Sequence, residues 1–295
     1  MNKTRKPGSL SVLLVHGFGA SIGHFKKNIV ELISSGYDVH AIDLLGFGAS
    51  EKPYEYQYTM EGWRDLLVSY LKEKVIPSST SEGVVIVGNS IGSLASLLTA
   101  KELVDESLDE KLKGVVLLNC AGGMNNAAVL DDDWRIKLAY PTFALINALL
   151  KIKPVAQFLF DKFRNKETIE NVLREVYRNQ DSVDDDLVEL IRQPSCAPGA
   201  LEAFVSILTG PPGPRPESAV GSLEGAEVPM LVLWGDDDPF TPIDGPVGKF
   251  FMESLEPRCD FVTKSILPDT GHCPHDDRPE EVHKVLLPWL AQLQL

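Results

Sequence analysis

Residues 84–92 have the sequence VVIVGNSIG, an apolar β-branched run followed at once by a G-x-S-x-G pentapeptide. The run predicts a buried strand, and the apolar spacing over residues 91–104 predicts a helix directly after the pentapeptide. Strand, tight turn and helix in this order form a nucleophile elbow, where glycines allow so tight a turn that the serine side chain stands free. Such a pentapeptide also occurs by chance in glycine-containing proteins, but the flanking strand and helix favour the elbow. Ser90 is therefore the candidate nucleophile.

Strand and helix patterns alternate on both sides of this elbow. We expect strands over residues 10–15, 38–42, 84–87, 114–119, 229–234 and 261–267. We expect helices over residues 25–34, 60–75, 91–104, 247–255 and 279–293. Alternation of this kind requires right-handed crossovers and helices on both faces of a mostly parallel sheet. The predicted fold class is α/β.

About a hundred residues between the strands ending at Asn119 and beginning at Pro229 break the alternation. They carry only helical patterns and are too many for a plain connection. We predict a helical lid over residues 123–222, inserted before the penultimate strand, with helices over residues 134–152, 154–163, 167–177, 184–192 and 199–208. A proline-rich stretch, residues 210–216, then leads the chain back to the sheet. Residues 1–122 and 223–295 form the two parts of the predicted core.

A candidate acid follows the penultimate strand, where residues 235–239 read GDDDP. Three adjacent aspartates leave the assignment open. Asp238, third after the glycine, is favoured by analogy with hydrolases that place an orienting acid there. Asp236 and Asp237 are expected to be solvated turn or cap residues.

A candidate base follows the last strand, where Gly271-His272 ends a loop before the final helix. A serine hydroxyl is a weak nucleophile unless a base accepts its proton, and an imidazole needs an acid on its far side to fix its tautomer. The chain order Ser90, Asp238, His272 supplies all three groups. His275 and His283 are expected to be surface or packing residues.

Candidate oxyanion donors lie near the first strand, in the loop His16-Gly17-Phe18-Gly19, and at the start of the helix after Ser90. A tetrahedral intermediate needs N–H groups aimed at its negative oxygen, and losing one costs about 3 kcal/mol. We predict that the backbone N–H groups of Phe18 and Ile91 fill this role. His16 itself is expected to fix the loop by hydrogen bonding.

Composition narrows the class of protein. The chain has 295 residues and a formal charge of −14, which disfavours nucleic acid as a partner. No apolar run is long enough to span a membrane, and the first residues lack a signal-peptide pattern. The sequence carries no metal-ligand spacing and no phosphate-binding G-x-x-x-x-G-K, so we expect neither a metal nor a cofactor. Scattered cysteines are expected to be free thiols in a reducing compartment: Cys120, Cys196, Cys259 and Cys273.

The sequence resembles the α/β-hydrolase superfamily along nearly its whole length, through HGFG, DLLGFGASEKP, GNSIGS, WGDDDPFTP and GHCPHDDRPEEV. Among its branches it most resembles the plant and cyanobacterial hydrolases grouped with pheophytinase and chlorophyll dephytylase, through NCAGGMN and AFVSILTGPPGP. This resemblance implies hydrolysis of a lipophilic small-molecule ester, the phytyl ester of a porphyrin-derived propionate. Ser90, Asp238 and His272 are carried over as its triad. The branch also implies a chloroplast location, with the cytoplasm as the alternative.

One feature departs from the superfamily pattern. Its members usually have two antiparallel strands before the HG loop, whereas nine residues precede the first predicted strand here. The strand over residues 38–42 is therefore expected to lie at an unpaired edge. We expect a truncated form, an incomplete gene model, or a protein that covers this edge otherwise.

The predicted lid is apolar and basic, with seven basic residues against one acidic residue over residues 134–166. A basic, apolar surface suits contact with an anionic membrane, so we hypothesise that the lid docks on lipid and admits a long apolar ester. An ordinary helical cap with solvated lysines is the alternative. Trp134, Phe143 and Phe204 are the candidate substrate-binding residues.

Other functions fit the same motifs. A triad also serves small-ester, thioester and carbon–carbon hydrolases, and a receptor can keep a triad that turns over slowly. Dehalogenase and epoxide-hydrolase chemistry is disfavoured, because those branches use an aspartate where Ser90 stands.

Overall fold

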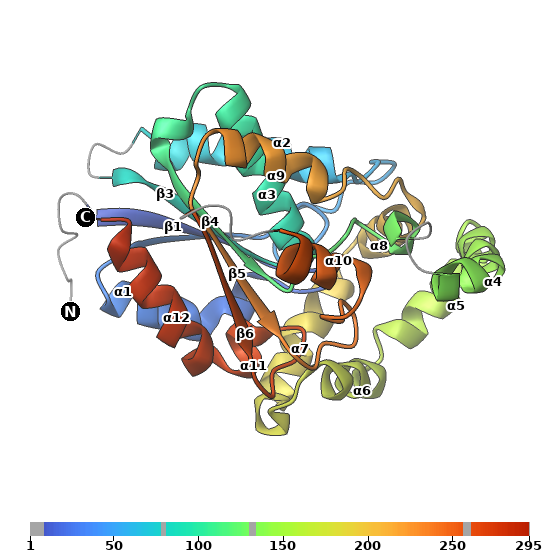
Figure 1. Ribbon diagram of the computed structural model, residues 1–295. Coiled ribbons are helices and arrows are strands. Elements are labelled where there is room, and N and C mark those ends of the chain that lie inside the picture. The colour runs from blue at the N-terminus through green and yellow to red at the C-terminus, as the bar shows by residue number, and fades with distance from the viewer. Residues whose placement is uncertain (1–8, 78–80, 130–133, 256–260, 295) are drawn as a thin grey trace.

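The computed structural model describes residues 9–77, 81–129, 134–255 and 261–294. Its centre is a six-stranded parallel sheet in the order β2-β1-β3-β4-β5-β6 (Figure 1). The strands are β1 (Ser9–Val15), β2 (Asp38–Ile42), β3 (Ser81–Asn89), β4 (Leu112–Leu118), β5 (Met230–Gly235) and β6 (Val262–Leu267). The predicted fold class is confirmed.

Helices fill the connections. Those between and after the strands are α1 (Lys26–Ser34), α2 (Met60–Tyr70), α3 (Ile91–Asp105), α10 (Pro246–Lys249), α11 (Pro274–Asp277) and α12 (Pro279–Gln292). Those between β4 and β5 are α4 (Trp134–Leu150), α5 (Lys153–Phe163), α6 (Lys166–Val176), α7 (Asp185–Ser195), α8 (Ala200–Thr209) and α9 (Glu217–Gly225). The chain after α2 and α10 continues as a single π-helical turn, over Leu71–Val75 and Phe250–Ser254.

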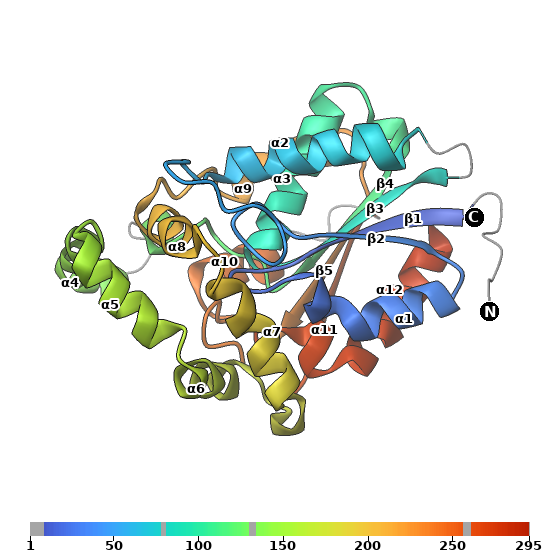
Figure 2. The same cartoon turned by 180° about the vertical axis from the view of Figure 1, so that it is seen from behind.

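Two apolar layers sandwich the sheet, because side chains alternate between the faces of a strand. On one face Leu13, Ile86 and Leu117 pack against α2, α3 and α9. On the other face Leu14 and Val87, with their neighbours, pack against α1 and α12. Figures 1 and 2 show these helices on opposite sides of the sheet. Both layers converge on the carboxyl ends of the central strands, where the site is built.

The helices α4 to α8, called the inserted helices below, stand beside the carboxyl ends of the strands rather than on either face of the sheet (Figure 2). Helices α6 and α7 pack on each other through an apolar cluster of their own: Ile169, Leu173, Val176, Leu187 and Val188. The proline-rich stretch at residues 210–216 leads back to the core, as expected, but it is followed by the unpredicted helix α9. The expected boundary at residue 222 falls inside α9, whose Ala219, Val220 and Leu223 are buried against α3 and the sheet. Helix α9 therefore belongs to the core.

Strand β2 lies at one edge of the sheet and, among the described strands, pairs with β1 alone. All five of its residues are partly exposed, whereas β1, β4 and β5 are almost entirely buried. Polar side chains stand on this edge: Nε2 of His40 lies 3.1 Å from Oδ2 of Asp38, and its Nδ1 lies 3.1 Å from the Tyr70 hydroxyl. Among the described residues, no helix has the length and hydrophobicity needed to cross a bilayer.

Candidate active site

Ser90 stands between β3 and α3 with backbone angles of φ 56° and ψ −122°. A non-glycine residue at positive φ is strained, and such strain persists only where the surroundings enforce it. Here the Ser90 N–H donates to the Leu118 carbonyl at 3.0 Å, and its own carbonyl accepts from the N–H of Ala121 at 3.1 Å. The elbow is thus held from β4 and from the loop that follows it.

Two glycines make the tight turn possible. A Cβ atom on Gly92 would lie 2.4 Å from the His16 carbonyl oxygen, and one on Gly88 would lie 2.3 Å from that of Gly92. Both separations are far inside van der Waals contact, so no larger residue fits. The helix therefore starts directly beneath Ser90, whose side chain is left at the carboxyl edge of the sheet.

The structure brings Asp238 and His272 together. His272 Nδ1 lies 2.7 Å from Oδ2 of Asp238, and the two residues are 6% and 4% exposed. The neighbouring aspartates face elsewhere: Asp237 is largely exposed and pairs with Arg178 at 2.8 Å, while Asp236 accepts from the Thr270 N–H at 3.3 Å. Of the three candidates, Asp238 is the one in contact with His272.

Several donors converge on the Asp238 carboxylate. Oδ1 accepts from the backbone N–H groups of Phe240 and Thr241 at 2.7 and 3.1 Å. Oδ2 accepts from the Thr241 hydroxyl at 2.5 Å and from the Asn119 amide at 2.7 Å, besides His272. Burial alone would raise the pKa of Asp238, but the charge of His272 and these hydrogen bonds hold it well below its usual range. The carboxylate stays ionised at neutral pH, which places the His272 proton on Nδ1 and leaves Nε2 free to accept one.

Ser90 and His272 line two cavities on either side of the elbow. The wide cavity has a volume of about 660 Å³ and is bounded by parts of segments 121–128 and 239–247. The apolar cavity has a volume of about 280 Å³ and lies under the inserted helices, against residues 17–20 and α6. Phe240 also lines both cavities. A substrate has room on two sides of Ser90.

The two candidate oxyanion donors flank Ser90. Phe18 lines the apolar cavity and Ile91 lines the wide cavity. Among the hydrogen bonds of the described residues, neither backbone N–H group has a protein acceptor. A developing oxyanion needs free backbone N–H groups of this kind.

His16 is fully buried below this loop. Its Nδ1 donates to the Gly17 carbonyl at 2.8 Å and its Nε2 accepts from the Leu44 N–H at 3.0 Å. Burial lowers the pKa of His16, so the ring is neutral. With both nitrogens engaged by backbone, His16 fixes the loop.

Sequence reasoning missed two residues that hold the site together. Asn119, directly after β4, donates to Asp238 and accepts from the Gly235 N–H at 3.0 Å. Asp277, which is fully buried, accepts from the N–H groups of Gly271 and Asn179, each at 2.7 Å. The signal for Asn119 was its place at the carboxyl end of a strand next to β5. Asp277 carried no signal for its link to the inserted helices, because Asn179 lies 98 residues away in the sequence.

Among the predicted substrate-binding residues, Phe204 is the one whose side chain the structure describes. The side chains of Trp134 and Phe143, in α4, lie outside the described residues. Phe204 lines neither of the two cavities and belongs to a third pocket nearby. Within the described ranges, no group of three or more His, Cys, Asp or Glu side chains is arranged to hold a metal ion. The described cysteines Cys120, Cys196 and Cys273 are free thiols, and Cys259 lies outside the described residues.

Comparison with known proteins agrees with this architecture. The chain is 26% identical over 319 residues to the chloroplastic pheophytinase of Arabidopsis thaliana, a match that covers 96% of this chain and 62% of that protein, less than two thirds of its length. It is 26% identical to 2-hydroxymuconate semialdehyde hydrolase of a Pseudomonas strain, over 90% of this chain and 80% of that one. An esterase structure from Thermogutta terrifontis superposes with a TM-score of 0.66 at 22% identity, covering 98% and 92% of the two chains, which shows the shared fold.

The match to the family itself extends over residues 12–285, described as the alpha/beta hydrolase family. That range includes the elbow, both candidate oxyanion positions and the loops of Asp238 and His272. By sequence and by fold, this chain belongs to the alpha/beta hydrolase family.

Proposed function

We propose that the protein is a serine hydrolase that cleaves a carboxylic ester through an acyl-enzyme. The observation that carries the proposal is the 2.7 Å contact between His272 Nδ1 and the ionised Asp238, in the wall of cavities that Ser90 also lines. With Nδ1 engaged by Asp238, His272 Nε2 is the ring nitrogen left to act as the base in these cavities.

The proposed reaction has two halves. Ser90 Oγ attacks the ester carbonyl carbon while its proton passes to His272 Nε2, and the N–H groups of Phe18 and Ile91 stabilise the negative oxygen. The carbon–oxygen bond to the alcohol then breaks, and the alcohol leaves with the proton from His272. Water attacks the acyl-enzyme in the same way, releasing the carboxylic acid and restoring Ser90. Asp238 stays ionised throughout and stabilises the imidazolium.

A lipophilic ester is the substrate class that we propose. The apolar cavity beside Ser90 is walled by side chains such as Ile169, Leu173 and Val176, which favour a hydrocarbon chain. The similarity to pheophytinase supports a phytyl ester of a chlorophyll-derived pigment as the specific substrate, and a chloroplast location with it. A cytoplasmic small-ester or carbon–carbon hydrolase is the alternative, supported by the similarity to 2-hydroxymuconate semialdehyde hydrolase.

We also propose that the inserted helices, the lid of the protein, make peripheral contact with an anionic membrane. Large apolar side chains are exposed on α4 and α5, with Leu138 at 76%, Leu145 at 60% and Phe158 at 61%. Lys153, which is 82% exposed and lies 3.9 Å from Glu202, begins α5 in a segment rich in basic residues. Sedimentation with phosphatidylserine vesicles at low salt, reduced by Leu145→Asp, is the expected result. Failure of the protein to sediment would end this part of the proposal.

The catalytic proposal is tested with a fluorophosphonate probe, which reports an activated serine without knowledge of the substrate. Intact-mass analysis should show one adduct on the wild type and none on Ser90→Ala. A folded protein that takes up no probe would instead favour a receptor that binds without turnover. Hydrolysis of phytyl esters against short-chain esters then separates the lipophilic substrate from the small-ester alternative.

A further inference from the structure

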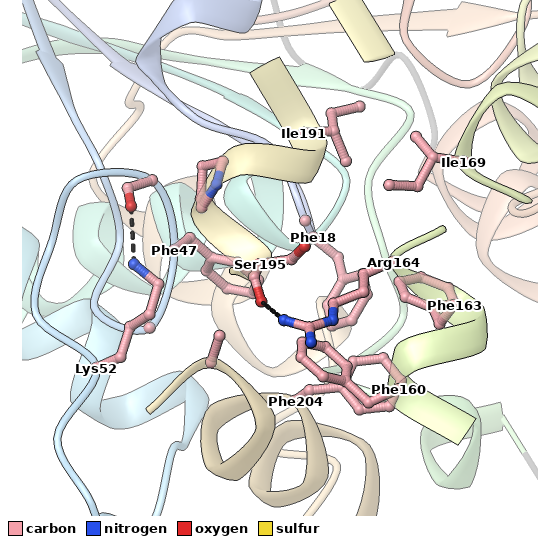
Figure 3. A pocket seen from close by; sticks show the side chains of 15 residues that line it. Phe18, Phe47, Lys52, Phe160, Phe163, Arg164, Ile169, Ile191, Ser195 and Phe204 are labelled. Atoms are coloured by element: carbon pink, nitrogen blue, oxygen red, sulfur yellow. Dashed lines mark hydrogen bonds between the residues drawn. The ribbon is translucent and has the colours of Figure 1, made fainter. Parts of the chain in front are cut away.

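A third pocket of about 60 Å³ shares residues with the apolar cavity, and five phenylalanine rings contribute to its wall (Figure 3). The Phe204 ring centre lies 5.0 Å from that of Phe160 and 5.1 Å from that of Phe163. The Phe18 ring completes the set at 6.2 Å from Phe204 and 5.5 Å from Phe47. We call this space the aromatic pocket. Its rings come from α5, α8 and two core loops, so folding of the whole chain creates it.

The aromatic pocket and the apolar cavity share a wall. The residues that line both are Phe18, Gly19, Phe163, Ile169 and Ile191. Phe163 is the last residue of α5 and is 38% exposed, and a side chain of this kind has more than one staggered rotamer. A turn of this one ring away from the wall would open the aromatic pocket to the cavity that contains Ser90.

The charged residues around the aromatic pocket are engaged by protein oxygens. Lys52 Nζ donates to the carbonyls of Gly48 and Ser50 at 2.7 and 3.1 Å. Arg164 pairs with Asp161 at 2.6 Å and donates to the Ser195 carbonyl at 3.3 Å, as the dashed line in Figure 3 shows. A ligand in the pocket would therefore contact the methylene groups of Lys52 and Arg164. The pocket is therefore suited to hydrocarbon rather than to an ionic group.

We propose that the aromatic pocket is the terminal subsite for the apolar chain of the ester, with Phe163 as the gate and Phe204 as the floor. The inference rests on the proposed function and narrows its substrate class to esters whose chain outgrows the first cavity. The chain runs from Ser90 through the apolar cavity, past Phe163, and ends against Phe160 and Phe204. Both the acyl and the alcohol half of an ester can supply such a chain.

Chain length is the property that this subsite controls. Each methylene that reaches the aromatic pocket should raise kcat/KM about fourfold, the gain expected from removing one CH₂ from water. Phe204→Trp fills the floor and should lower the ratio of kcat/KM for long over short chains at least tenfold. Phe204→Ala deepens the floor and should move the optimum to longer chains. A substitution that merely loosened the fold would lower the rates on all chain lengths alike.

The experiment compares two ester series, one with increasing acyl chain and one with increasing alcohol chain, from butyl to hexadecyl length. Wild type, Phe204→Trp, Phe204→Ala and the control Val30→Trp, at a 69% exposed position on α1, are assayed side by side. Opposite shifts by the two Phe204 variants in one series establish the subsite and identify the half of the ester that it holds. Hydrolysis with a length profile that both variants leave unchanged overturns the subsite alone. Absence of hydrolysis in wild type, together with absence of fluorophosphonate labelling, overturns the proposed function with it.

Discussion

The side-chain amide of Asn119 donates a hydrogen bond to Oδ2 of Asp238 at 2.7 Å. The same oxygen contacts His272, so the end of β4 fixes the carboxylate that orients the proposed base. The side-chain oxygen of Asn119 accepts a hydrogen bond from the Gly235 N–H, which fixes the orientation of the amide. Asn119 therefore links the ends of β4 and β5 through one side chain, and Asp238 extends the link to His272 after β6.

Asn119→Leu removes this donor from a buried carboxylate. We expect kcat/KM to fall about tenfold or more, because a hydrogen bond to a charged group contributes about 1.5–3 kcal/mol. Steady-state kinetics on a soluble ester measures the loss, and a thermal melt shows that the variant is folded. A kcat/KM within about twofold of wild type would mean that Asp238 is oriented without Asn119.

Asp238→Asn keeps the size of the side chain but can present an N–H to His272. The imidazole would then adopt the wrong tautomer, and kcat should fall about 10⁴-fold. Asp237→Asn is the matched control, since its carboxylate is 68% exposed and pairs with Arg178. Comparable losses in the two variants would contradict the assignment of the acid.

Sequence patterns predicted the alternation of strands and helices well, because the signals for these elements are local. An apolar run lies a few residues before Ser90 and another lies a few residues before Asp238. The glycines that allow the elbow also lie within two residues of Ser90. Helix α9 was missed because it is short, contains Gly221 and Gly225, and follows a proline-rich stretch, while its burial depends on packing against α3. Phe204 was predicted to bind substrate beside the site, but its position relative to Ser90 depends on how α5 and α8 pack.

Asp277 joins the inserted helices to the loop of His272, and sequence reasoning could not foresee the link. Its carboxylate accepts from Gly271, the residue before His272, and from Asn179, which follows α6. The His272 N–H also donates to the Val176 carbonyl at 3.0 Å. The end of α6 is therefore in direct hydrogen-bond contact with the loop of the proposed base.

Asp277→Asn is expected to leave at least one of these buried N–H groups without an acceptor, a cost of about 1–3 kcal/mol. Both the free energy of unfolding and kcat should decrease, because the loop of His272 loses its tether. The control Asp269→Asn removes a carboxylate that is 74% exposed and paired with Arg278. Equal behaviour of the two variants in urea unfolding and in kinetics would show that the tether is dispensable.

Acid should destabilise the protein through buried histidines. Burial lowers the pKa of His24 to about 4 from 6.5, although Asp276 opposes the shift. Between these two pKa values His24 binds a proton in the unfolded chain but stays neutral in the folded protein. The stability that neutral His24 contributes is therefore complete above the unfolded pKa and is lost as the pH falls toward the folded pKa.

The His24 contribution should decrease by about 2 kcal/mol between about pH 7.5 and about pH 5. His24→Gln cannot titrate and can still donate to Tyr177, which lies 2.5 Å from His24 Nε2. The free energy of unfolding of this variant should therefore depend less steeply on pH than that of wild type. Some pH dependence should persist, because the buried His275 and His16 are still present. Parallel pH profiles from urea titrations would contradict the role of His24.

The acyl-enzyme on Ser90 is the central claim, and trapping it is the most direct test. The protein is mixed with a long-chain p-nitrophenyl ester, quenched with acid within the first turnover, and digested for peptide mass mapping. We predict one acyl group on the peptide that contains Ser90, formed together with a burst of p-nitrophenol and absent from Ser90→Ala. Turnover by Ser90→Ala at the wild-type rate, or an acyl group on another residue, would contradict the account.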